Sequence, residues 1–460
     1  MNESAHNNPL GYAPLPRLIT KFAIPSIISM LVSAIYNITD QIFIGNIIGM
    51  YGNAATNVAF PVVMLTIAFS QISGVGTAAN FNICMGAKRT EDAKNYIGTG
   101  LTLVTLFGLV ITAVVLGFKT PLLWLCGATE SVFDYADVYL GITALGLPFL
   151  LLGNAMATLI RADGSPRYSM FSSIIGAVLN VGLDALFMLH FRWGIQGAAW
   201  ATIIGQIVSF LVSLGYFFHF KAFPVTRSML GLKGKYVVSI LKLGLSSFIN
   251  HMVMTVVNIV LNNMLKKYGA ESIYGSDIPL AVAGIAAKIN SILIAFAVGI
   301  AHGCQPIFGY NMGAKNYDRV KKTYTFALSV ALVIGLVAFA AFQLFPRQIT
   351  SIFGSGEPLY YDFAAKYLRI YLMMVIVVGT QPLTLSYFTS IGNVRQGLVI
   401  SLSRQGFLLL PLLVLLPMIF GLNGVLWAGA MADTLACILA IFLVARDFKR
   451  LDRLKAAEVQ

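Results

Sequence analysis

Apolar stretches long enough to cross a lipid bilayer recur along the whole length of this chain. The hydrocarbon core of a bilayer is about 30 Å thick, so a helix needs about 20 mostly apolar residues to span it. The 460 residues are 58% hydrophobic and only 11% charged, whereas a soluble domain carries about 25% charged residues. Such a composition cannot cover a water-exposed surface. We therefore predict an all-α integral membrane protein.

Hydropathy, charge and the positions of glycine and proline predict twelve spanning helices in two groups of six. We expect an amino-terminal tail at 1–15, an amino-lobe at 16–220, a basic linker at 221–235, a carboxy-lobe at 236–446 and a carboxy-terminal tail at 447–460. The spans are predicted at 16–45, 54–82, 95–117, 135–161, 167–190, 194–219, 236–266, 279–310, 321–344, 361–390, 395–418 and 423–446.

The two groups of helices repeat one another. The tetrapeptide Met-Gly-Ala-Lys occurs at 85–88 and again 227 residues later, at 312–315. Trp200 recurs as Trp427 at the same offset. Because each half has an even number of spans, the halves are parallel repeats related by an axis along the membrane normal. Two such lobes enclose a cleft, and rocking them exposes the cleft to one side and then the other. This pattern predicts a transporter.

Topology explains the net charge of +13 without any nucleic-acid partner. If the amino terminus is cytoplasmic, most Lys and Arg fall in cytoplasmic loops, as the positive-inside rule expects. Residues 1–14 lack a basic start followed by a short apolar core, so we predict no cleavable signal peptide. We expect a multi-pass protein of the cytoplasmic (inner) membrane that contacts lipid and has both termini in the cytoplasm.

Two acidic residues of the first half are predicted to lie inside spanning helices, where an ionisable group is costly and functional by default. They are Asp40 and Asp184. Asn37 shares a helix face with Asp40, and Asn180 shares one with Asp184. Thr202 on the sixth helix adds a hydroxyl. Their oxygens can ligate Na⁺, and two nearby carboxylates can equally hold one proton. The alternative for the Asn and Thr residues is hydrogen bonding between helices.

The second half contains a third buried acid, Asp433, with Lys288, Arg404 and His302 as candidate partners. Pairing with one of them would make Asp433 structural, so both roles stay open. His251 and His302 are titratable, but a lone histidine in a membrane helix is more often a packing residue.

Catalytic and cofactor motifs are absent from the sequence. There is no Walker A loop and no His/Cys cluster, so we predict no enzymatic activity and no cofactor. The energy for transport must then come from an ion gradient, a partner or the gradient of the substrate. The cysteines show neither metal-ligand spacing nor a disulfide framework, and we predict all four to be small core residues: Cys84, Cys126, Cys304 and Cys437.

Prolines and sulfur-containing or aromatic side chains mark further candidates in the helices. Pro25 and Pro61 lie inside the first two predicted spans, where each removes a backbone hydrogen bond. A hinge and a static bend are both open for them. Residues such as Tyr36 and Met64 suit an adaptable apolar pocket, although such side chains more often pack or face lipid.

Three segments resemble a known family. They are KFAIPSIISML at 21–31, YNITDQIFIG at 36–45 and GCQPIFGYNMGAK at 303–315. The chain resembles the multidrug and toxic compound extrusion (MATE) family over about residues 8–447, and in particular its MepA-like bacterial branch. The resemblance implies twelve helices in two pseudosymmetric lobes around a V-shaped central cleft.

The resemblance also implies a function. MATE proteins are antiporters that confer drug resistance by expelling amphipathic, often cationic drugs and dyes in exchange for inward H⁺ or Na⁺. By motif match, the cation site falls on Asp40, Asn180, Asp184 and Thr202, and the helix-bending proline falls on Pro25. Tyr36 and Asn154 match positions that face the cavity, and Met64 is a further candidate substrate contact. The seventh helix, where some branches carry an acid, offers Asn and His instead, which puts a carboxy-lobe cation site in doubt.

Two other functions stay open at this point. A flippase for lipid-linked sugars or phospholipids, from the same wider superfamily, predicts a cleft rich in Arg and Lys and often fourteen helices. A membrane receptor or scaffold predicts binding without flux, and the repeat and the buried acids argue against it. We expect a monomeric multidrug exporter.

Overall fold

The computed structural model describes residues 8–275, 277–351 and 358–459, and every regular element among them is helical. Twelve stretches of this described chain are long and apolar enough to cross a membrane, which confirms the predicted all-α membrane fold. The spans of the first half are α2 (Leu15–Ile47), α3 (Met50–Gly86), α4 (Thr90–Gly117), α6 (Glu130–Thr143) with α7 (Leu147–Ala162), α8 (Pro166–Asp184) with the π-helical turn η3 (Ala185–His190), and α9 (Ile195–Phe217).

The second half follows the same plan. Its spans are α10 (Gly234–Ala270), α11 (Asp277–Gly313), α12 (Tyr317–Leu344), α14 (Pro358–Ile370) with α15 (Thr380–Ser390), α16 (Val394–Leu402) with the π-helical turn η6 (Ser403–Leu409), and α17 (Leu410–Val459). Gly421, with a φ of 57°, breaks α17 into the end of the eleventh span and the whole of the twelfth. Short helices flank the spans: α1 (Pro9–Tyr12), α5 (Lys119–Leu125) and α13 (Pro346–Ser351).

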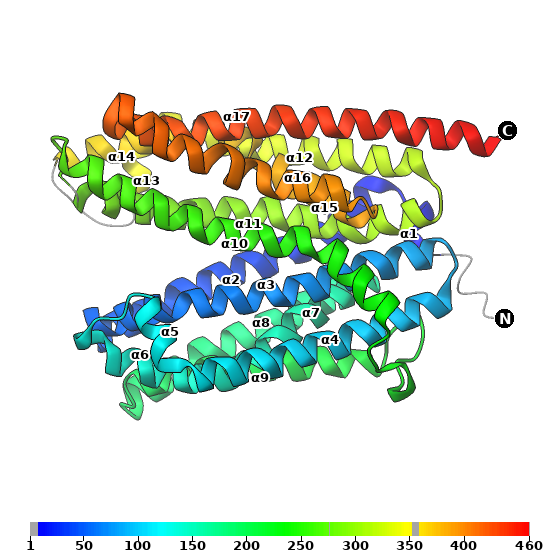
Figure 1. Cartoon of the computed structure of the whole chain (residues 1–460), viewed down its shortest axis with the longest axis horizontal. Coiled ribbons are helices and arrows are strands. Elements are labelled where there is room, and N and C mark those ends of the chain that lie inside the picture. The colour runs from blue at the N-terminus through cyan, green and yellow to red at the C-terminus, as the bar shows by residue number, and fades with distance from the viewer. Residues whose placement is uncertain (1–7, 276, 352–357, 460) are drawn as a thin grey trace.

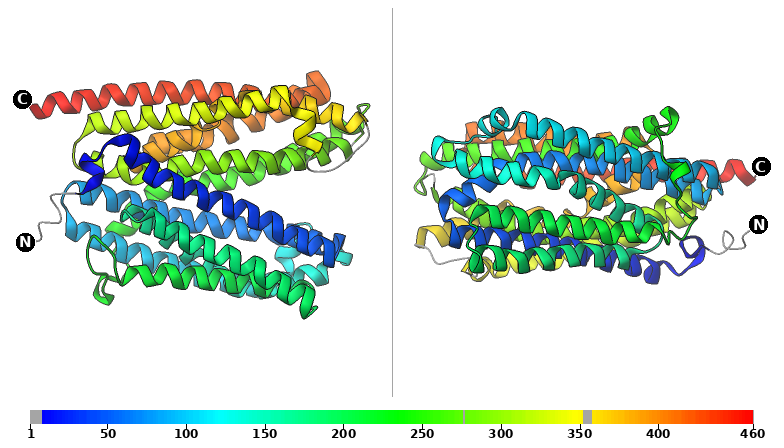
Figure 2. Two further views of the ribbon diagram at one scale, coloured as in Figure 1. Left: turned by 180° about the vertical axis from the view of Figure 1, so that it is seen from behind. Right: turned by 90° about the horizontal axis from the view of Figure 1, so that it is seen from below.

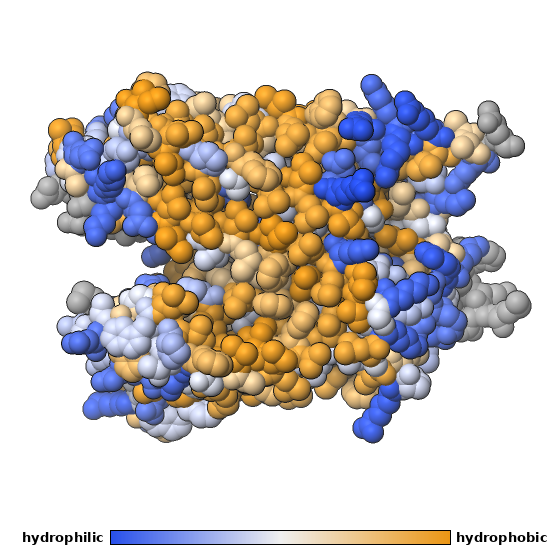
Figure 3. Space-filling model, in the orientation of Figure 1, coloured by the Kyte–Doolittle hydropathy of each residue, from blue (hydrophilic) through white to orange (hydrophobic). Residues whose placement is uncertain are grey.

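The two halves form two layers that lie side by side (Figure 1). Helices α2 to α9 make the amino-lobe and α10 to α17 the carboxy-lobe, and both termini lie at the same end of the bundle (Figures 1 and 2). We call this the termini end. Figure 3 shows a broad apolar belt across the middle of the molecule, with polar residues gathered at both ends. Such a belt is the surface that a bilayer requires.

The lobes contact one another mainly through α3 on α10 and α2 on α11, and α3 also packs on α11 at the termini end. A Cβ atom built on Gly86 would lie 1.9 Å from the carbonyl oxygen of Tyr310, and one on Gly313 would lie 2.0 Å from that of Ile83. These glycines belong to the two Met-Gly-Ala-Lys repeats, so each lobe makes the same contact on the other. Only glycine lets the backbones come this close. At the opposite end, the surface is hollowed between the lobes (Figure 3).

The predicted carboxy-terminal tail is not a separate segment, because α17 continues as a helix to Val459. Asp447 is buried and accepts a 2.7 Å hydrogen bond from the Tyr387 hydroxyl. Further along, Asp452 forms an ion pair with Lys321 of α12. These charged partners hold the helix against the carboxy-lobe beyond the apolar span. Residue 460 lies outside the described residues.

The amino-terminal segment also docks on the carboxy-lobe. The side-chain amide of Asn311 donates a 2.9 Å hydrogen bond to the carbonyl of Leu10, and Arg319 Nε donates a 3.0 Å bond to the same oxygen. Residues 1–7 of the predicted tail lie outside the described part of the chain. The segment that precedes α2 therefore ties the start of the amino-lobe to the other lobe.

Candidate functional site

Helices α2 and α8 pack together and bring two buried carboxyl groups into one place. Asp184 is the last residue of α8, is fully buried and directly precedes the π-helical turn η3. The carboxyl groups of Asp40 and Asp184 lie near enough to interact electrostatically, and no hydrogen bond between them is formed. Two carboxylates have only acceptor atoms, so this proximity needs a shared proton or a cation between them.

Several acceptor atoms at this place have no partner. Both carboxylate oxygens of Asp184, Oδ1 of Asp40 and Oδ1 of Asn180 are buried without a hydrogen bond. The amide of Asn180 reaches the Thr202 hydroxyl at 3.5 Å. Among the described residues, no Lys or Arg forms an ion pair with either acid. Because unpaired buried oxygens are costly, this all-oxygen group fits a proton or a Na⁺ ion.

Two tyrosines complete the group. Tyr36 of α2 lies within electrostatic reach of both acids. Tyr139 of α6 is buried and lies near Asp40 and Thr202. No sequence pattern pointed to Tyr139, because α6 reaches the site only by packing against α9. The structure therefore places Tyr36, Asp40, Tyr139, Asn180, Asp184 and Thr202 around one point of the amino-lobe.

Asn37 does not join this group. Its amide donates a 2.7 Å hydrogen bond to the carbonyl of Ser33, one turn back on α2, and its side chain is exposed. Residues three apart on a helix are offset by about 60° around the axis. Asn37 therefore lies on the same broad face as Asp40 but does not reach the site. Of the other predicted substrate contacts, Met64 on α3 is half-buried and Asn154 on α7 is exposed.

Pro25 lies inside α2 but far from the acids. Fifteen residues separate it from Asp40, about 22 Å along a helix axis. Pro25 instead lies where α2 crosses α11: Cβ atoms built on Gly299 and Gly303 would lie 2.7 Å from the Cα atoms of Ile27 and Ala23. A bend at this proline would therefore act on the contact between the lobes rather than directly on the carboxyl groups.

The carboxy-lobe holds a neutralised pair instead. Arg404 of η6 forms an ion pair with Asp433 of α17. Of the other candidate partners, Lys288 is exposed, and His302 contacts Gln305, with 3.4 Å between Nδ1 and Oε1. Of the two roles left open for Asp433, the structure shows the pairing with a cation, and the partner is Arg404.

Neither the cysteines nor the histidines form a metal centre in the part of the chain that the structure describes, where no group of three or more His, Cys, Asp or Glu residues gathers. All four cysteines are free; Cys84 and Cys304 are buried, and Cys126 and Cys437 are half-buried.

Two parallel six-helix lobes, tightly packed at one end and carrying a buried polar site in one lobe, define the architecture of a secondary transporter. The MatE family model matches residues 25–186 and 246–415, and the chain belongs to this family. It is 26% identical over 449 residues to the multidrug export protein MepA of Staphylococcus haemolyticus, with 95% of each chain covered. It is 25% identical to MepA of Staphylococcus aureus, with 94% of each covered.

Solved structures share the fold. A multidrug resistance MATE family transporter in an outward-facing conformation has a TM-score of 0.89 at 23% identity, with 98% of each chain covered. A MATE protein in the straight conformation has a TM-score of 0.90 at 23% identity, with 98% of this chain and all of that chain covered. A transporter from Pyrococcus furiosus, described as having a binding pocket of reverse polarity, has a TM-score of 0.89 at 23% identity, with 98% and 99% covered.

Proposed function

We propose that this protein is a multidrug exporter that exchanges amphipathic, often cationic compounds for inward H⁺ or Na⁺ by alternating access. The observation that carries the proposal is the proximity of two acids inside the membrane-spanning bundle, buried Asp184 and half-buried Asp40, neither of which has a cationic partner among the described residues. The names of the staphylococcal relatives support drugs as the substrates. We infer that it works as a monomer in the cytoplasmic membrane, with the termini end in the cytoplasm.

The coupling ion acts by neutralising this pair. With one proton or one Na⁺ bound, the pair carries less negative charge, and α2 and α8 can pack without repulsion between the acids. Without the ion, the charge favours a different arrangement of the two helices or the entry of a cationic compound. Tyr36 lies on α2 beside the carboxyl groups, so both ion binding and the entry of a cationic compound change its surroundings. We assign Tyr36, Met64 and Asn154 as substrate contacts and Pro25 as the hinge of α2.

The experiment is ethidium efflux from proteoliposomes under a proton gradient or a sodium gradient imposed separately. Wild-type protein should export ethidium under one gradient. Asp40→Asn keeps the shape of the side chain and removes its charge, so it should abolish efflux while the protein still inserts and folds. Efflux driven by neither gradient, with folded protein, would contradict the exchange. Full efflux by the variant would contradict the role of Asp40.

The matched control is Asn37→Ala on the same helix. The Asn37 amide is bonded to its own helix and lies away from the acids. This variant should therefore retain efflux and the same ion dependence. If it lost efflux to the same degree as Asp40→Asn, the cation site would have to extend to the exposed side of α2, and the proposed group of ligands would be wrong.

A lipid-linked flippase is not favoured. That function predicts a basic cleft and often fourteen spans, whereas twelve spans occur among the described residues. The unpaired charges of the amino-lobe site are acidic, and they suit a cation or a cationic drug better than a phosphate.

A further inference from the structure

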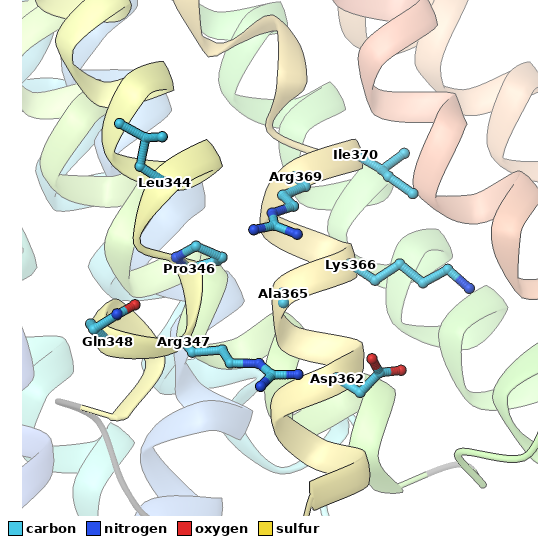
Figure 4. A pocket seen from close by; sticks show the side chains of 9 residues that line it. All are labelled: Leu344, Pro346, Arg347, Gln348, Asp362, Ala365, Lys366, Arg369 and Ile370. Carbon is cyan, nitrogen blue, oxygen red and sulfur yellow. The ribbon is translucent and has the colours of Figure 1, made fainter.

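A pocket of about 630 Å³ opens on the carboxy-lobe at the end opposite the termini (Figure 4). It lies between the end of α12, the short helix α13 and the second half of α14, outside the site described above. Its walls combine charged and apolar side chains, all within described segments. The lining residues are Leu344, Pro346, Arg347, Gln348, Asp362, Ala365, Lys366, Arg369 and Ile370.

Two arginines face this space from opposite sides. Figure 4 shows Arg347 of α13 extending toward α14 at the level of Asp362, and Arg369 of α14 extending toward Pro346, just after the end of α12. Arg369 Nε donates a 3.3 Å hydrogen bond to the carbonyl of Gln343, which fixes the side chain and leaves its terminal nitrogens free to bind. No described carboxylate pairs with either guanidinium. The two guanidinium groups carry ten N–H donors, and one of them is used in this bond. The pocket therefore offers nine donors and an excess of positive charge.

The acid in the pocket wall does not neutralise these arginines. Asp362 accepts a 2.8 Å hydrogen bond from the Tyr274 hydroxyl, and Lys366 Nζ lies 6.0 Å from the centroid of the same tyrosine ring. Both side chains extend from the other side of α14 (Figure 4). They form a local group with Tyr274, and among the described lining residues three cations (Arg347, Lys366 and Arg369) outnumber one acid.

An apolar surface leads to the pocket along α12. Val333, Val337 and Leu344 are each more than 60% exposed, and their spacing of four and seven residues puts them on one face of the helix. In a membrane protein such a face contacts acyl chains. A ligand held by Arg347 and Arg369 can thus place a hydrocarbon chain beside α12. A soluble anion has no such chain.

The equivalent place of the amino-lobe pairs its cation with an acid. Lys119 follows the end of α4 at nearly the same offset as Arg347 follows the end of α12, and it forms a 2.8 Å ion pair with Asp137 of α6. In the amino-lobe, Lys119 therefore has an acid as its neighbour. In the carboxy-lobe, Arg347 shares its pocket with a second arginine, Arg369. With the termini end in the cytoplasm, as proposed above, these two arginines lie on the outer side, where basic residues are depleted, and neither pairs with a described carboxylate.

We propose that this arginine pocket, formed by Arg347 and Arg369, binds the phosphate group of an anionic phospholipid, with the acyl chains along α12. Guanidinium groups bind phosphate through paired N–H donors. An anionic headgroup such as phosphatidylglycerol keeps its net negative charge, whereas the choline of phosphatidylcholine would meet two cations. The inference concerns the lipid around the carboxy-lobe and is independent of the proposed drug exchange.

The test uses the full chain in vesicles, with Phe345→Trp as a reporter beside the pocket and the four native tryptophans replaced by phenylalanine. Brominated phosphatidylglycerol and brominated phosphatidylcholine quench tryptophan fluorescence on contact, and their competition gives a relative affinity. We expect a preference of about tenfold for phosphatidylglycerol, since each basic residue contributes a several-fold increase in anionic lipid binding. Arg347→Gln together with Arg369→Gln should reduce the preference to about one.

The matched control is Lys119→Gln, which removes a basic residue at the equivalent place of the other lobe and should leave the preference unchanged. An equal affinity for both lipids in the unmodified pocket, or a preference that survives the double substitution, would overturn the proposal. If soluble glycerol phosphate displaced the brominated lipid as effectively as phosphatidylglycerol does, the pocket would bind a soluble phosphate compound rather than a lipid, and the proposal would be wrong.

A second measurement avoids the tryptophan replacements. A photoactivatable phosphatidylglycerol is cross-linked to the native chain, and the labelled peptides are identified by mass spectrometry. Label on α12 to α14 that disappears in the Arg347→Gln/Arg369→Gln variant supports the site. Label that is unchanged in the variant contradicts it.

Discussion

The two lobes share one plan but treat their buried charges in opposite ways. In the amino-lobe, Asp40 and Asp184 face each other without a cation. In the carboxy-lobe, Asp433 is paired with Arg404. Both groups lie next to a π-helical turn in the fifth span of their lobe, η3 or η6. The two lobes therefore share the same local backbone. They differ in their side chains, which form an unpaired acidic group in one lobe and a neutral ion pair in the other.

This difference explains why only one lobe has the properties of an ion site. A buried acid that already has a fixed cation gains little from a mobile one, whereas two unpaired acids can be stabilised only by a proton or an ion. The carboxy-lobe pair is expected to serve the fold, and the amino-lobe pair to serve coupling. The following substitutions test this division.

The largest effect is expected from Asp184→Asn. It removes one of the two charges that hold the coupling ion, so drug efflux in proteoliposomes should fall to background, a loss of at least about a hundredfold if ion binding provides 3 kcal/mol of coupling. The fold should be as stable as before or more stable, because a buried charge is lost. Thermal unfolding in detergent measures the stability. A large fall in stability together with retained efflux would reverse the roles of the lobes.

Asp433→Asn should have the opposite signature. It leaves Arg404, whose side chain is 23% exposed, without a counter-charge, which should cost less than the roughly 3–5 kcal/mol typical of a fully buried pair. The melting temperature should fall while the ion dependence of the remaining efflux stays the same. Replacing both partners, Arg404→Leu with Asp433→Leu, should recover most of the lost stability. If the double variant folds well but loses ion coupling, the carboxy-lobe pair takes part in transport and the division between the lobes is wrong.

A smaller, symmetric effect is expected at the seam between the lobes. Gly86→Ala and Gly313→Ala each put a Cβ where a backbone oxygen of the other lobe now lies, so α3 and α11 must separate. Each should cost about 1–3 kcal/mol, as overpacking does, and favour the state that is open at the termini end. Spin labels on the two helices, read by pulsed electron resonance, would report the longer distance. Unequal effects would show that the repeats do not share the contact equally.

The smallest effect is expected from Lys119→Gln in the amino-lobe. The Lys119–Asp137 pair is partly exposed, and such pairs contribute about 0–1 kcal/mol. Neither stability nor efflux should change measurably, which makes the variant a suitable control for the arginine pocket. A clear loss of stability in an unfolding experiment would indicate that this pair holds α5 and α6 in place more firmly than an exposed ion pair can.

Much of the candidate site could be predicted from single residues. Asp40, Asp184 and Asp433 stood out because an acid in an apolar helix is rare and costly. Asn37 was predicted as a cation ligand because its spacing from Asp40 fits a helix face. Its amide is instead bonded to the carbonyl of Ser33. Tyr139 escaped prediction, because a tyrosine in a membrane helix is common and only the packing of α6 on α9 brings it to Thr202.

Hydropathy and the repeat spacing alone determine that this chain has twelve spans in two parallel lobes, since apolar length and helix parity are properties of the linear chain. Only the tertiary structure decided which charges meet. Arg404 rather than Lys288 or His302 reaches Asp433, the two Met-Gly-Ala-Lys glycines meet across the seam, and Arg347 and Arg369 line one pocket. Such contacts depend on how helices rotate and cross, which side-chain packing between distant segments sets.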